Sequence, residues 1–133
     1  MIYLDTSVAL LSLLGQSGAD EAARLIMDAR VTEGLVSSCL LQVEMARAAH
    51  RDHFDVRVVD EFIAGVELIE IGPDVVERAS ALTGELKSLD AIHLATATLL
   101  DDPRHPVTVL THDARLADAA RSRGLGVIDP LGS

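Results

Sequence analysis

Four acidic residues in this chain stand where carboxylates commonly do chemistry. Asp5 follows the apolar letters MIYL and Asp113 follows VTVLT, so each comes close to the end of a candidate strand. Glu44 lies among apolar neighbours in LLQVEMARAA, and Asp90 lies near the start of SLDAIHLA. Asp5 is the most unusual, because an ionised carboxylate between a buried strand and a buried helix is costly unless a positive charge compensates it.

Clustered carboxylates repel one another, and a divalent cation relieves that repulsion. Mg²⁺ and Mn²⁺ are hard ions that prefer oxygen ligands and retain waters. Such a cation can activate a water, orient it toward a phosphate and neutralise the charge that develops on the phosphoryl oxygens. We therefore expect the positive charge beside Asp5 to be a metal ion.

Three of the acids also have a purely structural interpretation. Asp113 would cap the helix that follows it, and Asp90 would favour the positive end of its own helix. Glu44 would form an ion pair with Arg47, one turn later. For His93, one turn after Asp90, we expect packing or hydrogen bonding within the fold rather than metal ligation.

The elements that position these acids alternate along the chain. Hydrophobic alternation and turn residues predict strands at 1–6, 34–38, 67–73, 106–111 and 125–130. Helical spacing predicts helices at 7–15, 19–30, 39–51, 52–66, 74–86, 88–100 and 114–124. Ser37 or Ser38 is a candidate cap for the helix at 39–51, and Ser88 for the helix at 88–100.

This alternation predicts an α/β fold, because strands separated by helices pair in parallel. In an open parallel sheet, ligands bind at the carboxyl ends of the strands. Asp5 and Asp113 would lie at that edge, and Glu44 and Asp90 would reach it from helices packed on the sheet. The four carboxylates would therefore converge from four separate segments.

Length and composition predict one domain over residues 1–133. The chain has 133 residues, of which 49% are hydrophobic, enough for one core. Its single cysteine, Cys39, excludes an internal disulfide.

No apolar run approaches the roughly 18 residues of a membrane span, so we expect a cytoplasmic protein without membrane contact. A mean hydropathy of +0.30 indicates apolar surface covered by an oligomer contact or a partner.

Charge and aromatic content argue against a simple nucleic-acid binder. The net charge is −10, whereas phosphate binding normally leaves a basic footprint. Only 2% of the residues are aromatic, which leaves almost no platform for stacking bases. Any contact with RNA would depend on bound cations and local basic residues such as Lys87, Arg47 and Arg51.

Four stretches together resemble a known family. YLDTSVALLSLL, VSSCLLQVEMARAA, LKSLDAIHLATA and VLTHDARLADAARSRGLGVIDP are similar, in order, to the successive motifs of PIN domains, most closely the VapC-type toxins of bacterial toxin–antitoxin modules. Matched by motif, the four conserved acids of the family correspond to Asp5, Glu44, Asp90 and Asp113. The hydroxyl positions beside them correspond to Thr6, Ser7 and Thr111.

The resemblance implies a three-layer α/β/α domain with a five-stranded parallel sheet. It also implies a Mg²⁺- or Mn²⁺-dependent endoribonuclease that acts as a toxin, forms a homodimer and is inhibited by a VapB-like antitoxin. Asp5 would be the central metal ligand, with Asp90 and Asp113 as direct or water-mediated ligands. Glu44 would bind metal through water or orient the attacking water, and the hydroxyls of Thr6, Ser7 and Thr111 would hold the carboxylates in place.

Two other functions remain as alternatives. A metal-dependent phosphatase also uses aspartates at strand ends, but its paired Asp-x-Asp after the first strand is absent from YLDTS. A PIN-fold binding module that has lost catalysis is the second alternative. Loss of at least one acid would be its expected signature, yet all four acids are present.

Overall fold

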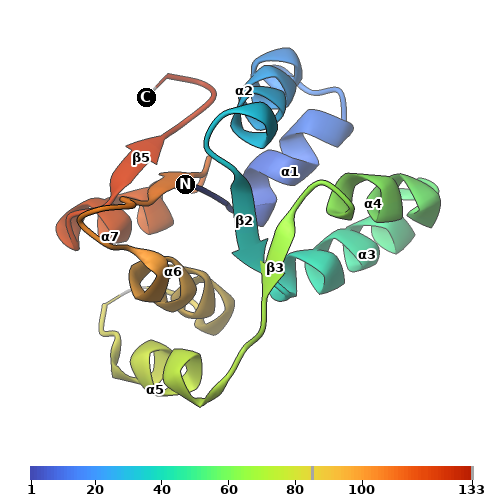
Figure 1. Ribbon diagram of the computed structural model, residues 1–133. Coiled ribbons are helices and arrows are strands. Elements are labelled where there is room, and N and C mark those ends of the chain that lie inside the picture. The colour runs from blue at the N-terminus through green and yellow to red at the C-terminus, as the bar shows by residue number, and fades with distance from the viewer. Residues whose placement is uncertain (85, 133) are drawn as a thin grey trace.

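A parallel β-sheet forms the centre of the protein, as the computed structural model, which describes residues 1–84 and 86–132, shows. Its strands are β1 (Ile2–Leu4), β2 (Leu35–Ser38), β3 (Glu67–Ile69), β4 (Thr108–Leu110) and β5 (Gly126–Ile128). All four neighbouring pairs are parallel, in the order β3-β2-β1-β4-β5 (Figure 1). The predicted five-stranded parallel sheet is confirmed.

Helices cover both faces of this sheet and give three layers (Figure 1). The elements of one face are α1 (Thr6–Leu13), α2 (Ala19–Val31), α3 (Leu40–Asp52) and α4 (Val56–Ile63), which share one buried apolar cluster. On the other face lie α6 (Ser88–Leu100) and α7 (Ala114–Ser122), with α5 (Pro73–Ala81) packed against α6.

The central strand β1 supplies both apolar clusters, because successive side chains of a strand point to opposite faces. Ile2 and Leu4 belong to the cluster under α1 to α4, whereas Tyr3 belongs to the cluster under α6 and α7. All three are buried. This is why the strand reads as a continuous apolar run.

The order of the strands reverses between β1 and β4. The chain moves outward from β1 to β2 and β3, then crosses the sheet to β4 and continues to β5. Leu4 pairs with Leu110, and the amide of Asp5 donates to the carbonyl of Leu110 at 3.0 Å. Residues that follow these two strands therefore meet at the switch point, the usual ligand site of open α/β sheets.

Several element boundaries differ from the sequence prediction. The strand predicted at 67–73 ends at Ile69. The helix predicted at 74–86 ends at Ala81, because Leu82 has extended backbone angles (φ −70°, ψ 132°); position 85 lies outside the described residues. Ser88 is the first residue of α6 and not its cap. Ser38 behaves nearly as predicted, since its Oγ accepts a hydrogen bond from the amide of Leu40 at 3.1 Å.

The helices of this fold are short. Among residues 1–84 and 86–132, none combines the length and the apolar character that crossing a membrane requires.

Candidate active site

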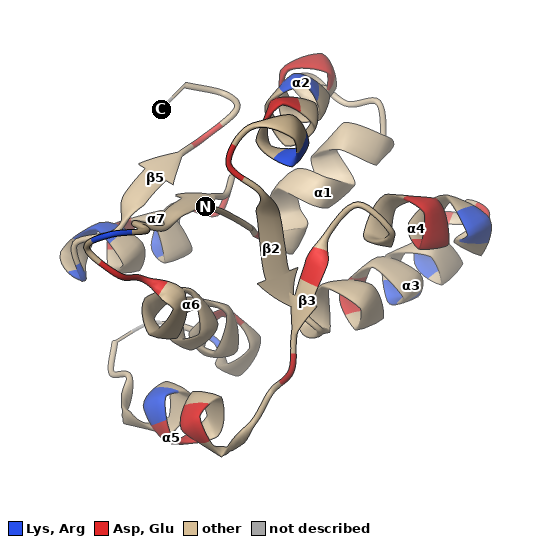
Figure 2. Cartoon of the chain, in the orientation of Figure 1, with Lys and Arg blue, Asp and Glu red and all other residues tan. Residues whose placement is uncertain are grey.

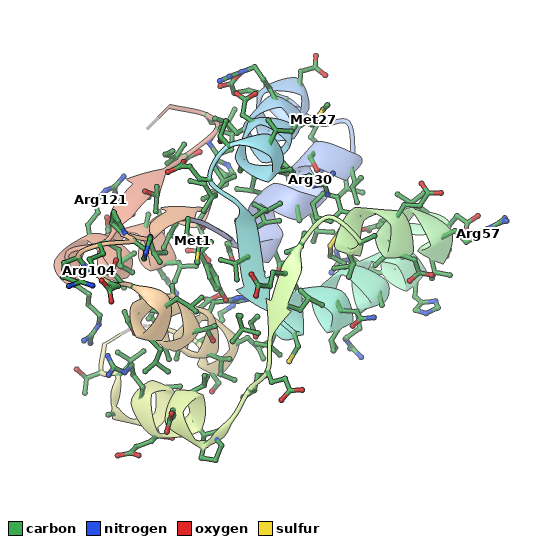
Figure 3. The ribbon with its side chains drawn as sticks, viewed as in Figure 1. Met1, Met27, Arg30, Arg57, Arg104 and Arg121 are labelled. Atoms are coloured by element: carbon green, nitrogen blue, oxygen red, sulfur yellow. The ribbon has the colours of Figure 1, made fainter. Side chains whose placement is uncertain are left out.

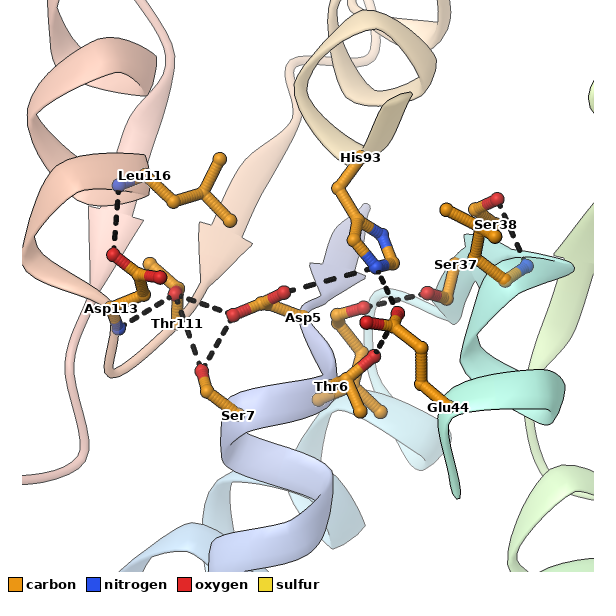
Figure 4. A network of polar contacts seen from close by, with 12 residues as sticks. Asp5, Thr6, Ser7, Ser37, Ser38, Glu44, His93, Thr111, Asp113 and Leu116 are labelled. Carbon is orange, nitrogen blue, oxygen red and sulfur yellow. Dashed lines mark hydrogen bonds and ion pairs between the residues drawn. The ribbon is translucent and has the colours of Figure 1, made fainter. Parts of the chain in front are cut away.

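Asp5 lies at the centre of a polar network at the switch point (Figure 4). It directly follows β1 and is only 4% exposed. Its Oδ2 accepts hydrogen bonds from Ser7 Oγ at 2.6 Å and from Thr111 Oγ1 at 2.8 Å. Two of the three predicted hydroxyls therefore hold one oxygen of Asp5, across the junction of β1 and β4.

Glu44 reaches the same network from α3. Its Oε1 accepts a hydrogen bond from Thr6 Oγ1 at 2.8 Å and lies 2.7 Å from His93 Nε2. The same Nε2 is 4.0 Å from Asp5 Oδ1, so the carboxylates of Asp5 and Glu44 flank one imidazole nitrogen. The ion pair with Arg47, the alternative structural interpretation of Glu44, is absent from the described residues, and His93 is the partner of Glu44 instead.

Asp113 has the structural role that the sequence left open. It is the N-cap of α7, and its Oδ1 accepts hydrogen bonds from the amides of Arg115 at 2.9 Å and Leu116 at 3.2 Å. Its own amide donates to Thr111 Oγ1 at 3.0 Å. Thr111 therefore connects Asp113 to Asp5, and the capping bonds occupy Oδ1 of Asp113.

Asp90 lies in the first turn of α6 and lines an open cavity of about 350 Å³ together with Lys87, Asp113, Ala114 and Arg115. Burial raises the pKa of Asp90, and the negative charges of Asp113, Asp5 and Glu44 raise it further, against an opposing effect of His93. The cavity thus brings Asp90 beside Asp113, and the effect of the other acids on Asp90 is to favour its neutral form.

His93 is almost fully buried, at 1% exposure, and bonds on both sides of its ring. Its Nδ1 lies 2.7 Å from the hydroxyl of Tyr3, which also accepts a hydrogen bond from the amide of Ser38 at 3.1 Å. The expectation that His93 is a hydrogen-bonded residue of the fold is confirmed. Tyr3 was missed, because an aromatic residue in a buried strand gives no signal beyond its contribution to the core.

The acid–imidazole contact shifts the pKa values of both partners. Burial alone would lower the pKa of His93, but the hydrogen bond to Glu44 and the charges of Asp5, Glu44 and Asp90 raise it overall. Burial alone would raise the pKa of Glu44, but the hydrogen bond and charge of His93, with the bond from Thr6, lower it overall. Each shift favours the charged form of its group.

The acids fit a hard divalent cation by their chemistry. They offer carboxylate oxygens, the ligands that Mg²⁺ and Mn²⁺ prefer, and Mg²⁺ usually keeps several waters and binds one or two carboxylates directly. In the part of the chain that the structure describes, no three His, Cys, Asp or Glu side chains already form a metal-binding group.

Comparison with known proteins identifies the family. The model of the PIN domain matches residues 2–122. The chain belongs to the PIN domain family. Two relatives from Mycobacterium tuberculosis, both named as ribonucleases, match over the full length. VapC35 is 33% identical over 132 residues, with 98% of this chain and 97% of the relative covered. VapC46 is 35% identical over 133 residues, with 97% of each covered.

A solved structure supports the same assignment. One chain of a toxin–antitoxin complex from Klebsiella pneumoniae superimposes on this PIN domain with a TM-score of 0.72, at 25% identity, with 98% of each chain covered. The similarity spans the whole chain rather than one motif. The acids at the switch point of this PIN domain are therefore the candidate active site.

Proposed function

We propose that this chain, one PIN domain over residues 1–133, is a metal-dependent endoribonuclease and the toxin of a toxin–antitoxin module. One observation carries the proposal. His93 contacts both Asp5 and Glu44, Thr111 connects Asp5 to Asp113, and Asp90 lines the same cavity as Asp113, in a chain that is similar over 97–98% of its length to two named ribonucleases.

The four acids are proposed to hold Mg²⁺ or Mn²⁺. Asp5 is the central ligand, because Ser7 and Thr111 fix one of its oxygens and the other faces the site. Asp90 and Asp113 bind directly or through water. When bound, the cation supplies the positive charge that activates water and offsets the charge of the reacting phosphate. Glu44, held by Thr6 and His93, orients the attacking water or binds the cation through water.

RNA would have to approach an acidic protein. Lys and Arg residues are interspersed with acids along the outer helices (Figure 2). Two basic residues, Lys87 and Arg115, line the cavity beside Asp90 and Asp113 and are placed to contact an RNA phosphate. Tyr3 is buried and offers no stacking surface. We therefore propose contacts to the RNA backbone rather than to stacked bases.

An antitoxin and a second copy of the chain are the proposed protein partners. Large apolar side chains remain exposed on several helices, among them Met27 at 65% and Val31 at 82% on α2 (Figure 3). A VapB-like antitoxin would cover part of this surface, as would a homodimer contact. The proposed toxin would act in the cytoplasm, where its RNA substrate and its antitoxin are both present.

The direct test is RNA cleavage by the purified chain in the presence of Mg²⁺ or Mn²⁺. The chain should cut cellular RNA when the cation is present, and this cleavage should stop when excess chelator is added. Undiminished cleavage in excess chelator would contradict metal dependence. RNA binding without cleavage would indicate a silent PIN module, and hydrolysis of small phosphate esters in place of RNA would indicate a phosphatase.

The toxin role needs a separate test in cells. Induced expression of the wild-type chain should arrest growth, and co-expression of the protein encoded beside it should restore growth. Arrest by a cleavage-defective Asp5→Asn variant would contradict a toxin that acts through ribonuclease activity.

A further inference from the structure

The imidazole of His93 is nearly sealed from solvent, at 1% exposure, and bonds to the candidate catalytic acid Glu44. One ring nitrogen lies 2.7 Å from Glu44 Oε1 and the other lies 2.7 Å from the Tyr3 hydroxyl. The rings of His93 and Tyr3 meet edge to face, with centroids 5.8 Å apart. This arrangement restrains the ring from both ends.

The groups available fix the direction of the bond to Glu44. The Tyr3 hydroxyl accepts from the Ser38 amide and can bond to Nδ1 in either state of the ring, as the donor to a neutral ring or as the acceptor from Nδ1–H of a charged ring. An ionised Glu44 has no proton to give, so Nε2 of His93 must donate to it. The chain of bonds therefore runs from the backbone of β2, through two buried rings, to a carboxylate at the site.

Glu44 requires such support. Its side chain has several rotatable bonds, lies on α3 and remains 25% exposed. Thr6 and His93 both bond to its Oε1, from α1 and α6, which fixes the carboxylate while Oε2 stays clear of these two bonds. Asp5, by comparison, directly follows its strand and needs only hydroxyl partners.

We propose that His93, backed by Tyr3, is a positioning residue that holds Glu44 beside Asp5 for its work on metal and water, an inference that rests on the proposed ribonuclease function. His93 does not ligate the cation. Its Nε2–H is committed to Glu44, and that bond sets the direction of the carboxylate. A buried imidazole needs a partner for each ring nitrogen, and the partner of Nε2 is here an acid of the candidate site.

Four variants separate positioning from packing. His93→Leu fills the space but cannot donate to Glu44, whereas His93→Gln can place an amide N–H near the position of Nε2. Tyr3→Phe removes the hydroxyl behind Nδ1 and keeps the aromatic ring. Ile26→Val, in the buried part of α2, is the control for a general loss of core packing.

Two measurements are made on each variant: the affinity for Mn²⁺ by titration calorimetry, and kcat and KM for a model RNA. We expect His93→Leu to lower Mn²⁺ affinity and kcat about tenfold, the size typical for loss of a residue that orients a ligand. KM should change little. His93→Gln should keep most of the Mn²⁺ affinity and of kcat. Tyr3→Phe should have intermediate values of both, and Ile26→Val should have the values of the wild type.

Wild-type affinity and kcat in His93→Leu would overturn the inference, and so would a His93→Gln variant as defective as His93→Leu. If His93→Leu fails to fold, Tyr3→Phe decides, because wild-type Mn²⁺ affinity in that variant contradicts a supporting chain of bonds. A wild type that binds Mn²⁺ but cuts no RNA would disprove the ribonuclease function alone. The Mn²⁺ affinities would then still test the position of Glu44.

Discussion

At the scale of single residues, the two strand-end aspartates use their oxygens differently. Asp5 occupies the N-cap position of α1 but makes no side-chain capping bond, and its Oδ2 accepts from hydroxyls instead. Asp113 occupies the N-cap position of α7 and does cap it. Asp113 therefore caps a helix in addition to its proposed catalytic role, whereas Asp5 caps none, and substitutions of Asp113 can distinguish its two roles.

The first prediction concerns Asp5→Asn. The amide oxygen can still accept from Ser7 and Thr111, while removal of the charge relieves repulsion among the acids. RNA cleavage should fall to background and the metal-free melting temperature should not decrease. Asp5→Ala, which leaves both hydroxyls without their acceptor, is the comparison and should melt lower. A strongly destabilised Asn variant would point to a structural ion pair with His93 instead.

The second prediction separates the two roles of Asp113. Serine caps helices about as well as aspartate but has no carboxylate, so Asp113→Ser should keep the stability of α7 and lose cleavage. Asp113→Ala should lose cleavage and also about 1 kcal/mol of stability. Chemical denaturation and RNA cleavage measured on both variants check this. Full activity in the serine variant would show that Asp113 is only a cap.

At the scale of elements, the site depends on how closely each helix follows its strand. The helix α1 begins at Thr6, one residue after Asp5, so Thr6 and Ser7 are fixed in its first turn. Hydroxyls in that turn then reach two different acids, Glu44 and Asp5. The next helix, α2, packs in the same apolar cluster, so the chain must turn back within residues 14–18.

Gly18 makes that turn possible and gives the third prediction. It precedes α2 in the left-handed region, at φ +92°, and an added Cβ would collide with the side chain of Leu131. Gly18→Ala should reduce the free energy of unfolding by about 1–2 kcal/mol, the cost of left-handed backbone for an L-residue. Gly72→Ala is the matched control, because it has ordinary backbone angles and open space around it. Equal stability of the two variants would contradict this account.

At the scale of the whole molecule, stability and metal binding should be linked. The protein carries a net charge of −10, and four of its acids share one site. Folding gathers these charges, whereas the unfolded chain separates them. A cation that binds only the folded chain therefore offsets their repulsion and stabilises the fold.

The fourth prediction is that Mn²⁺ raises the melting temperature of the wild type. At a concentration one hundred times the Kd, the gain in unfolding free energy should be about 2.7 kcal/mol. Thermal unfolding with and without Mn²⁺ measures this gain, and Asp5→Asn should show little of it. An equal rise in both proteins would mean that the ion binds elsewhere on the acidic surface.

The sequence by itself determined the acids, the alternation of strands and helices and the parallel sheet. These features are local: apolar runs with period-two or helical spacing, and an acid placed at the end of a strand. Parallel pairing then follows, because crossover helices separate the strands, and the edge that binds ligands follows from parallel pairing. Asp5 and Asp113 were predictable in this way.

Only the tertiary structure decided the partners of each acid. Glu44 had a near neighbour in Arg47, yet it bonds to His93, 49 positions away. Tyr3 and His93 are 90 positions apart, and Thr111 reaches Asp5 across 106. Such contacts depend on which faces of α3 and α6 point toward each other. Tertiary packing decides this, and the spacing of residues within one helix does not predict it. The roles of His93 and Tyr3 therefore emerge only once the fold brings these segments together.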